Sequence, residues 1–300
     1  MGVRAIPVLL LLLLLAPVPL SLLLIHPPVR PLQRSPVESG LTFEEVSFSS
    51  RTDGTLLRGW YLPGSSGDRT VILVHGWVND RLIHGRGLPL AGALIREGYN
   101  VLLFDLRGHG QSQGARVTLG AHEQGDVAGA VDFARQRGAR RIGVVGFSIG
   151  AVATLLAAAE EPAISVIVSD SAFTNLNSYL AGQVTERLHL PQGYAAYALL
   201  VYRLLSGIDP SGVAPLAALP RLAGRPVLFI HGTDDRVIPF TESQKLQAAL
   251  QGSELWLVLG ARHTHSFEAD PERYAERILG FLAQHLTAAR SDSHVLGPYQ

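Results

Sequence analysis

A sharp turn from a strand into a helix, near the middle of the chain, constrains the fold most. The run from Arg141 to Gly146 is apolar and β-branched, and an alanine-rich, helix-forming run follows up to Ala159. Between them, Gly146, Ser148 and Gly150 form a G-x-S-x-G pattern. Glycines on both sides let the backbone double back, which holds the serine exposed at the tip of a strand. We therefore predict that Ser148 is a nucleophile.

The composition indicates one large domain. The chain has 300 residues, of which 47% are hydrophobic, and its formal net charge is zero. This is enough apolar material for one large α/β domain, and the neutral charge balance gives no reason to expect a nucleic-acid partner. The absence of cysteine excludes disulfides, thiol catalysis and cysteine metal sites.

The N-terminus carries a long uncharged segment. Residues 6–25 contain no charged side chain and are long enough to cross a hydrocarbon core of about 30 Å as a helix. We predict that residues 1–26 form a transmembrane or signal anchor, with the catalytic domain on the extracytoplasmic side. The alternative is a signal peptide that is cleaved to give a secreted protein. Pro17, directly after Ala16, counts against cleavage.

The rest of the chain divides into a stalk, a domain and a tail. The proline-rich residues 27–40 read as an extended stalk, residues 41–290 as the folded domain, and residues 291–300 as a tail. Strand patterns alternate with helix patterns, which predicts a mostly parallel, eight-stranded sheet flanked by helices on both faces. The expected strands are 42–47, 55–62, 71–74, 100–104, 141–146, 163–168, 226–230 and 254–259.

One interval breaks this alternation. No strand pattern is seen between Asp170 and Pro226, and two apolar helical patterns, at 176–188 and 194–205, occupy the interval instead. A helical insertion near the nucleophile is typical of a lid, which we place at about 173–224. The alternative is an ordinary pair of packed helices. Three tyrosines of this interval are candidate substrate-binding residues: Tyr194, Tyr197 and Tyr202.

A nucleophilic serine needs a base, and the base needs an acid to orient it. Two aspartates, Asp234 and Asp235, follow one buried strand, and two histidines, His263 and His265, follow the last strand. The carboxyl ends of parallel strands share one edge of a sheet, so these side chains are expected near Ser148. The chain order Ser, Asp, His is that of a hydrolase triad.

An oxyanion also needs hydrogen-bond donors. The N–H of Ile149 lies at a helix N-terminus, where N–H groups are unpaired and the helix dipole favours negative charge. A second donor should come from the loop after the strand that ends at His75 and Gly76, and the N–H of Trp77 is the best candidate.

Five segments follow one another along the chain: VILVHGW (71–77), FDLRGHGQS (104–112), GFSIGA (146–151), HGTDDRVIP (231–239) and GARHTHSF (260–267). With these segments in this order, the chain resembles the α/β-hydrolase superfamily of serine esterases, lipases and aminopeptidase-like enzymes. In particular, it is similar to a branch of membrane-anchored bacterial esterases and acyl-thioesterases. The resemblance implies an α/β-hydrolase fold with a helical lid.

The resemblance also selects among the candidates. It implies that Asp235 rather than Asp234 is the acid, and that His263 rather than His265 is the base. Asp170 remains an alternative acid, because some members of the wider fold take the acid from the end of that earlier strand.

Other polar residues of the motifs have structural roles by the same resemblance. Asp105, in the D-x-R-G-x-G-x-S segment, is expected to brace a turn through local hydrogen bonds. His75 and His109 are expected to brace loops.

The predicted function is therefore a serine hydrolase that cleaves small-molecule carboxylic esters or thioesters through an acyl-enzyme on Ser148. No cofactor is expected, since Gly108 to Gly110 lacks the Lys-Ser/Thr of a nucleotide loop. No metal is expected either, because His263 and His265 have no further ligand at metal-site spacing. The alternatives are an aminopeptidase-like enzyme and a membrane-anchored binding module on a hydrolase fold. The sequence makes no prediction of oligomeric state.

Overall fold

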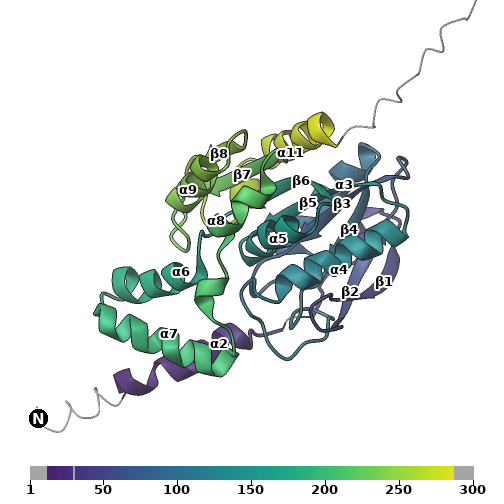
Figure 1. Ribbon diagram of the computed structural model, residues 1–300. Coiled ribbons are helices and arrows are strands. Elements are labelled where there is room, and N and C mark those ends of the chain that lie inside the picture. The colour runs from purple at the N-terminus through teal and green to yellow at the C-terminus, as the bar shows by residue number, and fades with distance from the viewer. Residues whose placement is uncertain (1–11, 30, 287–300) are drawn as a thin grey trace, which may run out of the picture.

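The computed structural model describes residues 12–29 and 31–286 (Figure 1). Residues 1–11 of the predicted anchor and the whole of the predicted tail therefore lie outside the described residues. Within the described part, the centre of the molecule is an eight-stranded sheet in the order β1-β2-β4-β3-β5-β6-β7-β8. The strands are β1 (Glu44–Ser49), β2 (Leu56–Leu62), β3 (Arg69–Val74), β4 (Asn100–Phe104), β5 (Arg141–Phe147), β6 (Ile164–Asp170), β7 (Val227–Gly232) and β8 (Glu254–Val258).

Six of the strands run in parallel, from β4 across to β8. The first two strands are antiparallel: β1 pairs with β2, and β2 pairs with β4. The sequence-based prediction of an α/β fold with a mostly parallel, eight-stranded sheet is therefore confirmed. The carboxyl ends of β3, β5, β6, β7 and β8 point to the same edge, which gathers the loops that follow them.

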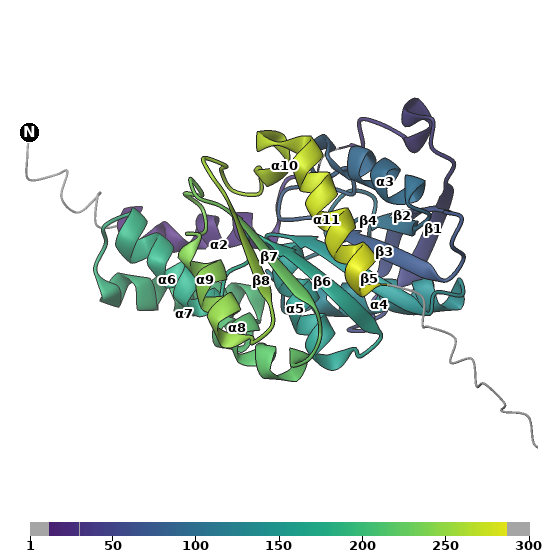
Figure 2. The same ribbon diagram turned by 90° about the horizontal axis from the view of Figure 1, so that it is seen from above.

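Helices cover both faces of the sheet (Figure 2). On one face lie α3 (Gly87–Arg96) and α11 (Pro271–His285), and on the other lie α4 (Glu123–Gln136), α5 (Ile149–Glu160) and α9 (Thr241–Ala249). The strands are apolar on both sides because side chains alternate between these two faces. In β3, Val71 and Leu73 pack with α3 and α11, whereas Ile72 and Val74 pack with α4 and α5.

The interval between β6 and β7 is helical throughout its regular parts. Helix α6 (Leu176–Gly182) runs into one π-helical turn, η3 (Gln183–Arg187), and α7 (Gln192–Ser206) follows. Both helices lie beyond the end of the sheet rather than on either face (Figures 1 and 2). The remaining short elements of the described chain are η1 (Pro36–Ser39), η2 (Ile83–Gly85), η4 (Pro210–Gly212), α8 (Pro215–Ala218), η5 (Leu219–Leu222) and α10 (Ser266–Ala269).

The N-terminal apolar segment packs against this helical interval. Helix α2 (Pro17–Ile25) lies along α7, as both views of the molecule show. No helix within residues 12–29 and 31–286 is long and apolar enough to cross a membrane. The membrane-spanning helix predicted for residues 6–25 is thus not found in the described part, and residues 6–11 lie outside it. Proline is the physical reason for the short helix, because Pro17 has no N–H and α2 begins there.

Candidate active site

Ser148 sits in the sharp turn between β5 and α5. Its backbone has φ 53° and ψ −118°, a conformation that L residues adopt only where the surroundings enforce it. The flanking glycines are required by space: a Cβ on Gly146 would lie 2.5 Å from the carbonyl oxygen of Gly150. A Cβ on Gly150 would lie 2.3 Å from the carbonyl oxygen of His75. The G-x-S-x-G pattern therefore forms the sharp strand-to-helix turn that the sequence predicted, but Ser148 is buried in this turn rather than exposed, at 9% of its surface.

The structure brings Ser148, His263 and Asp235 into one chain of hydrogen bonds. The hydroxyl of Ser148 lies 2.9 Å from Nε2 of His263, and Nδ1 of His263 lies 2.6 Å from Oδ2 of Asp235. Because a carboxylate accepts only, Nδ1 of His263 carries the proton and Nε2 is free to accept from the serine. The three residues follow β5, β8 and β7, so the common strand edge explains why they meet.

Asp235 is held by more than His263. Its Oδ1 accepts hydrogen bonds from the N–H groups of Val237 and Ile238, at 2.8 and 2.9 Å. Its Oδ2 also accepts from Nε2 of His231 at 3.0 Å. Burial alone would raise the pKa of Asp235, but the hydrogen bonds from His231, His263 and the main chain hold that pKa well below its usual range. The carboxylate is therefore ionised at neutral pH and oriented from several sides.

His231 is a residue that sequence reasoning missed. It is fully buried, and Nε2 faces two acceptors: Oδ2 of Asp235, and the carbonyl oxygen of Ile238 at 2.9 Å. Because both of these partners only accept, Nε2 carries a proton, and Nδ1 lies 2.7 Å from the hydroxyl of Ser243. The available signal was its place in the H-G-T-D-D segment, four residues before Asp235.

The two predicted oxyanion donors border the same space. Ile149 is the first residue of α5, where an N–H has no partner inside the helix. The loop after β3 lies directly against the nucleophile, since a Cβ on Gly76 would come within 3.2 Å of Cβ of Ser148. Both Trp77 and Ile149 line the cavity above Ser148.

The alternative acids and base are placed elsewhere. Asp234 is exposed to solvent. The carboxyl of Asp170 is fully buried and accepts from the hydroxyls of Ser171 and Tyr274, at 2.7 and 2.8 Å. Nδ1 of His265 lies 2.6 Å from the carbonyl oxygen of His263, so His265 donates to the loop that carries the base. None of these three hydrogen bonds involves the side chain of Ser148.

A largely apolar cavity of about 360 Å³ opens above Ser148. Its walls come from the loop after β3, from the turn between β5 and α5, from the helical interval and from the N-terminal segment. The described residues that line it are Leu24, Gly76, Trp77, Asn79, Ile83, His84, Leu119, Phe147, Ser148, Ile149, Phe173, Tyr179, Arg187, Val237, Ile238, His263 and Thr264.

The three tyrosines predicted to bind substrate do not line this cavity. The hydroxyl of Tyr194 donates to the carbonyl oxygen of Leu13 at 2.5 Å, and that of Tyr197 to the carbonyl oxygen of Leu14 at 2.8 Å. Tyr202 is buried in the apolar core. The tyrosine that does reach the cavity is Tyr179 on α6, which stacks on Phe173. Burial and the charge of Asp235 raise the pKa of Tyr179 to about 12, so its hydroxyl is neutral.

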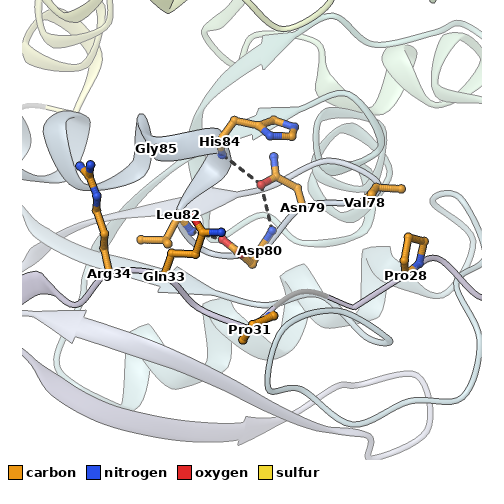
Figure 3. Close-up of a pocket in the computed structure, with 10 residues that line it drawn as sticks. All are labelled: Pro28, Pro31, Gln33, Arg34, Val78, Asn79, Asp80, Leu82, His84 and Gly85. Carbon is orange, nitrogen blue, oxygen red and sulfur yellow. Dashed lines mark hydrogen bonds between the residues drawn. The ribbon is translucent and has the colours of Figure 1, made fainter.

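A second cavity, of about 350 Å³, lies between the proline-rich segment before η1 and the loop after β3 (Figure 3). Asn79 and His84 line both cavities, so the two spaces are neighbours. The side chain of Asn79 ties this loop together, because its Oδ1 accepts from the N–H groups of Asp80 and His84. No residue of the Ser148 hydrogen-bond chain lines the second cavity.

Buried polar contacts brace the loops around the site. Asp105 accepts from the main-chain N–H groups of Arg81 and Gln111 and pairs with the Arg81 guanidinium at 2.6 Å. A Cβ on Gly110 would lie 2.1 Å from that carboxylate, so only glycine fits there. Nε2 of His75 accepts from the N–H of Leu106, and burial lowers the pKa of His75 to about 3. These contacts agree with the bracing roles expected for Asp105 and His75.

Among the described residues, no group of three or more His, Cys, Asp or Glu side chains is arranged to bind a metal ion.

The chain is similar to several known proteins. The chain is 28% identical to the uncharacterized protein YqkD of Bacillus subtilis over 232 residues, which is 75% of each chain. It is 31% identical over 235 residues to an uncharacterized protein of Mycobacterium tuberculosis, covering 76% of this chain and 73% of that one. Its fold is similar to the crystal structure of the Pyrococcus furiosus esterase Pf2001, with a TM-score of 0.73 and 26% identity over 87% of this chain and 100% of that chain.

A family model identifies the family of this chain. The model described as the alpha/beta hydrolase family matches residues 71–277, which include Ser148, Asp235 and His263. The match extends over more than half of the chain, and the chain therefore belongs to the alpha/beta hydrolase family.

Proposed function

We propose that this protein is a serine hydrolase that cleaves carboxylic esters or thioesters through an acyl-enzyme, an activity of class EC 3.1. The observation that carries the proposal is the hydrogen-bond chain from Ser148 through His263 to Asp235, at 2.9 and 2.6 Å. In that geometry a serine hydroxyl, a weak nucleophile in water, has its general base already in place.

The reaction would proceed in two halves. The Oγ of Ser148 attacks the substrate carbonyl carbon while its proton moves to Nε2 of His263. Collapse of the tetrahedral intermediate breaks the bond to the leaving alcohol or thiol, which takes that proton from His263. Water then attacks the acyl-enzyme with His263 again as base, and Ser148 leaves with the proton. Asp235 stays ionised and stabilises the imidazolium in both halves.

The developing oxyanion is stabilised by main-chain donors. We assign these to the N–H groups of Ile149 and Trp77, which border the cavity beside Ser148. Fixed donors of this kind act in a space from which water is excluded, so each contributes more than it would in water.

The cavity supports an acyl substrate. Apolar side chains of Leu24, Phe147, Phe173 and Leu119 form much of its wall, and its volume of about 360 Å³ suits a small acyl group. The similarity to the Pyrococcus furiosus esterase is in keeping with an ester substrate.

The test is covalent labelling combined with a substrate panel. A fluorophosphonate should label the wild-type chain on Ser148 and fail to label Ser148→Ala. The wild type should hydrolyse p-nitrophenyl acetate and a short acyl thioester, and Ser148→Ala should lose about 10⁴- to 10⁶-fold in kcat/KM. Faster cleavage of an aminoacyl amide than of the esters would favour the aminopeptidase alternative. No label and no turnover in folded protein would favour the binding module.

We also propose that the N-terminal segment attaches the enzyme to a membrane, with the catalytic domain on the extracytoplasmic side. Leucines at positions 12, 15 and 20 are exposed, and the uncharged run continues in the sequence back to Ile6. An apolar helix that lies on a lipid surface is a physical alternative to one that spans it. Flotation with lipid vesicles tests attachment, and protease access in intact cells tests the side. A chain that stays in the soluble fraction would contradict the first part, and protection from external protease would contradict the second.

A further inference from the structure

The C-terminal end of α2 is built into the hydrolase domain. Ile25 is only 1% exposed and belongs to the core that contains α4 and α5. Its carbonyl oxygen accepts from the N–H of Val117 at 2.8 Å, in the loop that precedes α4. A segment that served solely as a tether would not need to place its last residue inside the core.

The residue before it reaches the substrate cavity. Leu24 lines the cavity together with Ser148 and His263. Its carbonyl oxygen accepts from the indole N–H of Trp77 at 3.2 Å. Trp77 is the residue whose main-chain N–H we assign to the oxyanion, so Leu24 touches both the acyl space and the loop that carries the donor.

The other end of the segment is held by α7. Pro17 cannot donate to the carbonyl oxygen of Leu13, its partner four residues earlier, because proline has no N–H. The hydroxyl of Tyr194 donates to that carbonyl, and the hydroxyl of Tyr197 donates to the next one, on Leu14. We call α2, α6 and α7 the roof, since together they form the helical layer beyond the sheet end (Figure 1).

We propose that the N-terminal apolar segment is a wall of the active site, and that Leu24 sets the length of acyl chain that the cavity accepts. The inference rests on the proposed esterase function for its substrate. It implies that the segment stays on the working enzyme, because cleavage after residue 26 would remove the wall and leave Trp77 without its acceptor.

The test uses the full-length chain and two neighbouring leucines. Leu24→Trp adds bulk inside the cavity, Leu24→Ala removes it, and Leu23→Trp adds the same bulk at a position that is 50% exposed. Each variant is assayed on p-nitrophenyl esters from acetate to decanoate. We expect Leu24→Trp to lower the octanoate-to-acetate ratio of kcat/KM about 10-fold or more, since one methylene in an apolar pocket changes selectivity about 10- to 200-fold. We expect Leu24→Ala to move the optimum to a longer chain, and Leu23→Trp to stay within about twofold of the wild type.

The result that overturns the proposal is an active Leu24→Trp whose chain-length profile matches that of Leu23→Trp. Equal rates of fluorophosphonate labelling in the two variants would show that neither has lost its catalytic geometry.

A second measurement does not depend on turnover. The chain has no cysteine, so Leu24→Cys and Leu23→Cys each carry a single thiol. The thiol of Leu24→Cys should react with a maleimide at least about 10-fold more slowly than that of Leu23→Cys. Equal rates would overturn the proposal that the N-terminal segment is a wall of the active site. If the wild type neither hydrolyses esters nor labels on Ser148, the proposed function fails, and the thiol rates still decide whether Leu24 is enclosed.

Discussion

The catalytic edge of the sheet and the roof are held together by different kinds of contact. At the edge, one buried carboxylate, Asp235, accepts four hydrogen bonds from side chains and main chain. In the roof, α2 has no charged side chain, and two tyrosine hydroxyls reach main-chain carbonyls of the segment before it. Leu200 and Leu204 of α7 remain exposed beside them.

We infer from this difference that the edge acts on the catalytic step and that the roof acts on which substrate the cavity accepts. The bonds to Asp235 fix angles and distances at a charged group, which general base catalysis needs, whereas the roof meets the cavity through apolar side chains such as Leu24, which fix only its volume. We therefore expect changes at the edge to act mainly on kcat, and changes in the roof to act on substrate choice and on local stability.

The largest effect should come from the acid. Asp235→Asn replaces the acceptor of Nδ1 of His263 with a group that can donate, which disturbs the tautomer of the base. We expect kcat on p-nitrophenyl acetate to fall by about 10³- to 10⁴-fold. Asp234→Asn is the matched control, because this exposed neighbour makes no contact with His263 among the described hydrogen bonds, and it should stay within about twofold of the wild type. A larger loss of kcat in Asp234→Asn than in Asp235→Asn would assign the role of the acid to Asp234.

His231 should give the next largest effect. His231→Gln removes the Nε2–H bond to Oδ2 of Asp235, and hydrogen bonds to charged groups contribute roughly 1.5–3 kcal/mol. We expect kcat to fall by about 10-fold with KM little changed, since His231 does not line the cavity. Steady-state kinetics checks this, and a change confined to KM would show that His231 acts on the cavity rather than on the acid.

The ionised state of Asp235 should also appear in the pH dependence of stability. Its pKa in the folded chain is lower than that of an unfolded aspartate, about 3.9, because hydrogen bonds outweigh the effect of burial. The folded state thus gains stability above about pH 4 and loses it as the pH falls further. We expect the Tm difference between the wild type and Asp235→Asn to shrink from pH 7 to pH 3. A difference that grows in acid would contradict the assignment.

The smallest effect should come from the roof. Tyr197→Phe removes one hydroxyl bond to the carbonyl oxygen of Leu14, and a typical hydrogen bond contributes about 0.5–1.5 kcal/mol. We expect hydrogen exchange near α2 to speed up severalfold, with kcat on p-nitrophenyl acetate within about twofold of the wild type. Loss of kcat as large as in His231→Gln would remove the distinction between roof and edge.

Much of the fold could be predicted from the sequence because its strands are continuous apolar runs. The strands expected at 100–104 and 254–259 appear at Asn100–Phe104 and Glu254–Val258. The strand expected at 163–168 extends to Asp170, since main-chain pairing with β7 continues past the last apolar side chain. Hydrophobic patterns report burial, and a polar residue that still pairs through its backbone is invisible to them.

The helical interval was predicted less well. The pattern from 176 to 188 predicts one helix, but the α-helix ends at Gly182 and a π-helical turn replaces its second half. Apolar spacing does not distinguish these two windings over so short a stretch.

Of the candidate site, the sequence could predict those residues that directly follow strands of the sheet. Ser148, Asp235 and His263 follow strands of one parallel sheet, and this geometry alone brings their loops together. Leu24 could not be found in this way, because a leucine-rich helix has the same composition whether it packs on protein or on lipid. His231 could not be found either, since its partners Asp235 and Ser243 are set by how β7 and α9 pack.

The hydrogen bonds that hold the N-terminal segment to α7 have a consequence for which substitutions the segment tolerates. The hydroxyls of Tyr194 and Tyr197 bond to the main-chain carbonyl oxygens of Leu13 and Leu14, which every residue type supplies. We therefore expect apolar substitutions at these two positions to keep both hydrogen bonds, whereas substitutions at Leu24 and Ile25 alter the cavity and the core.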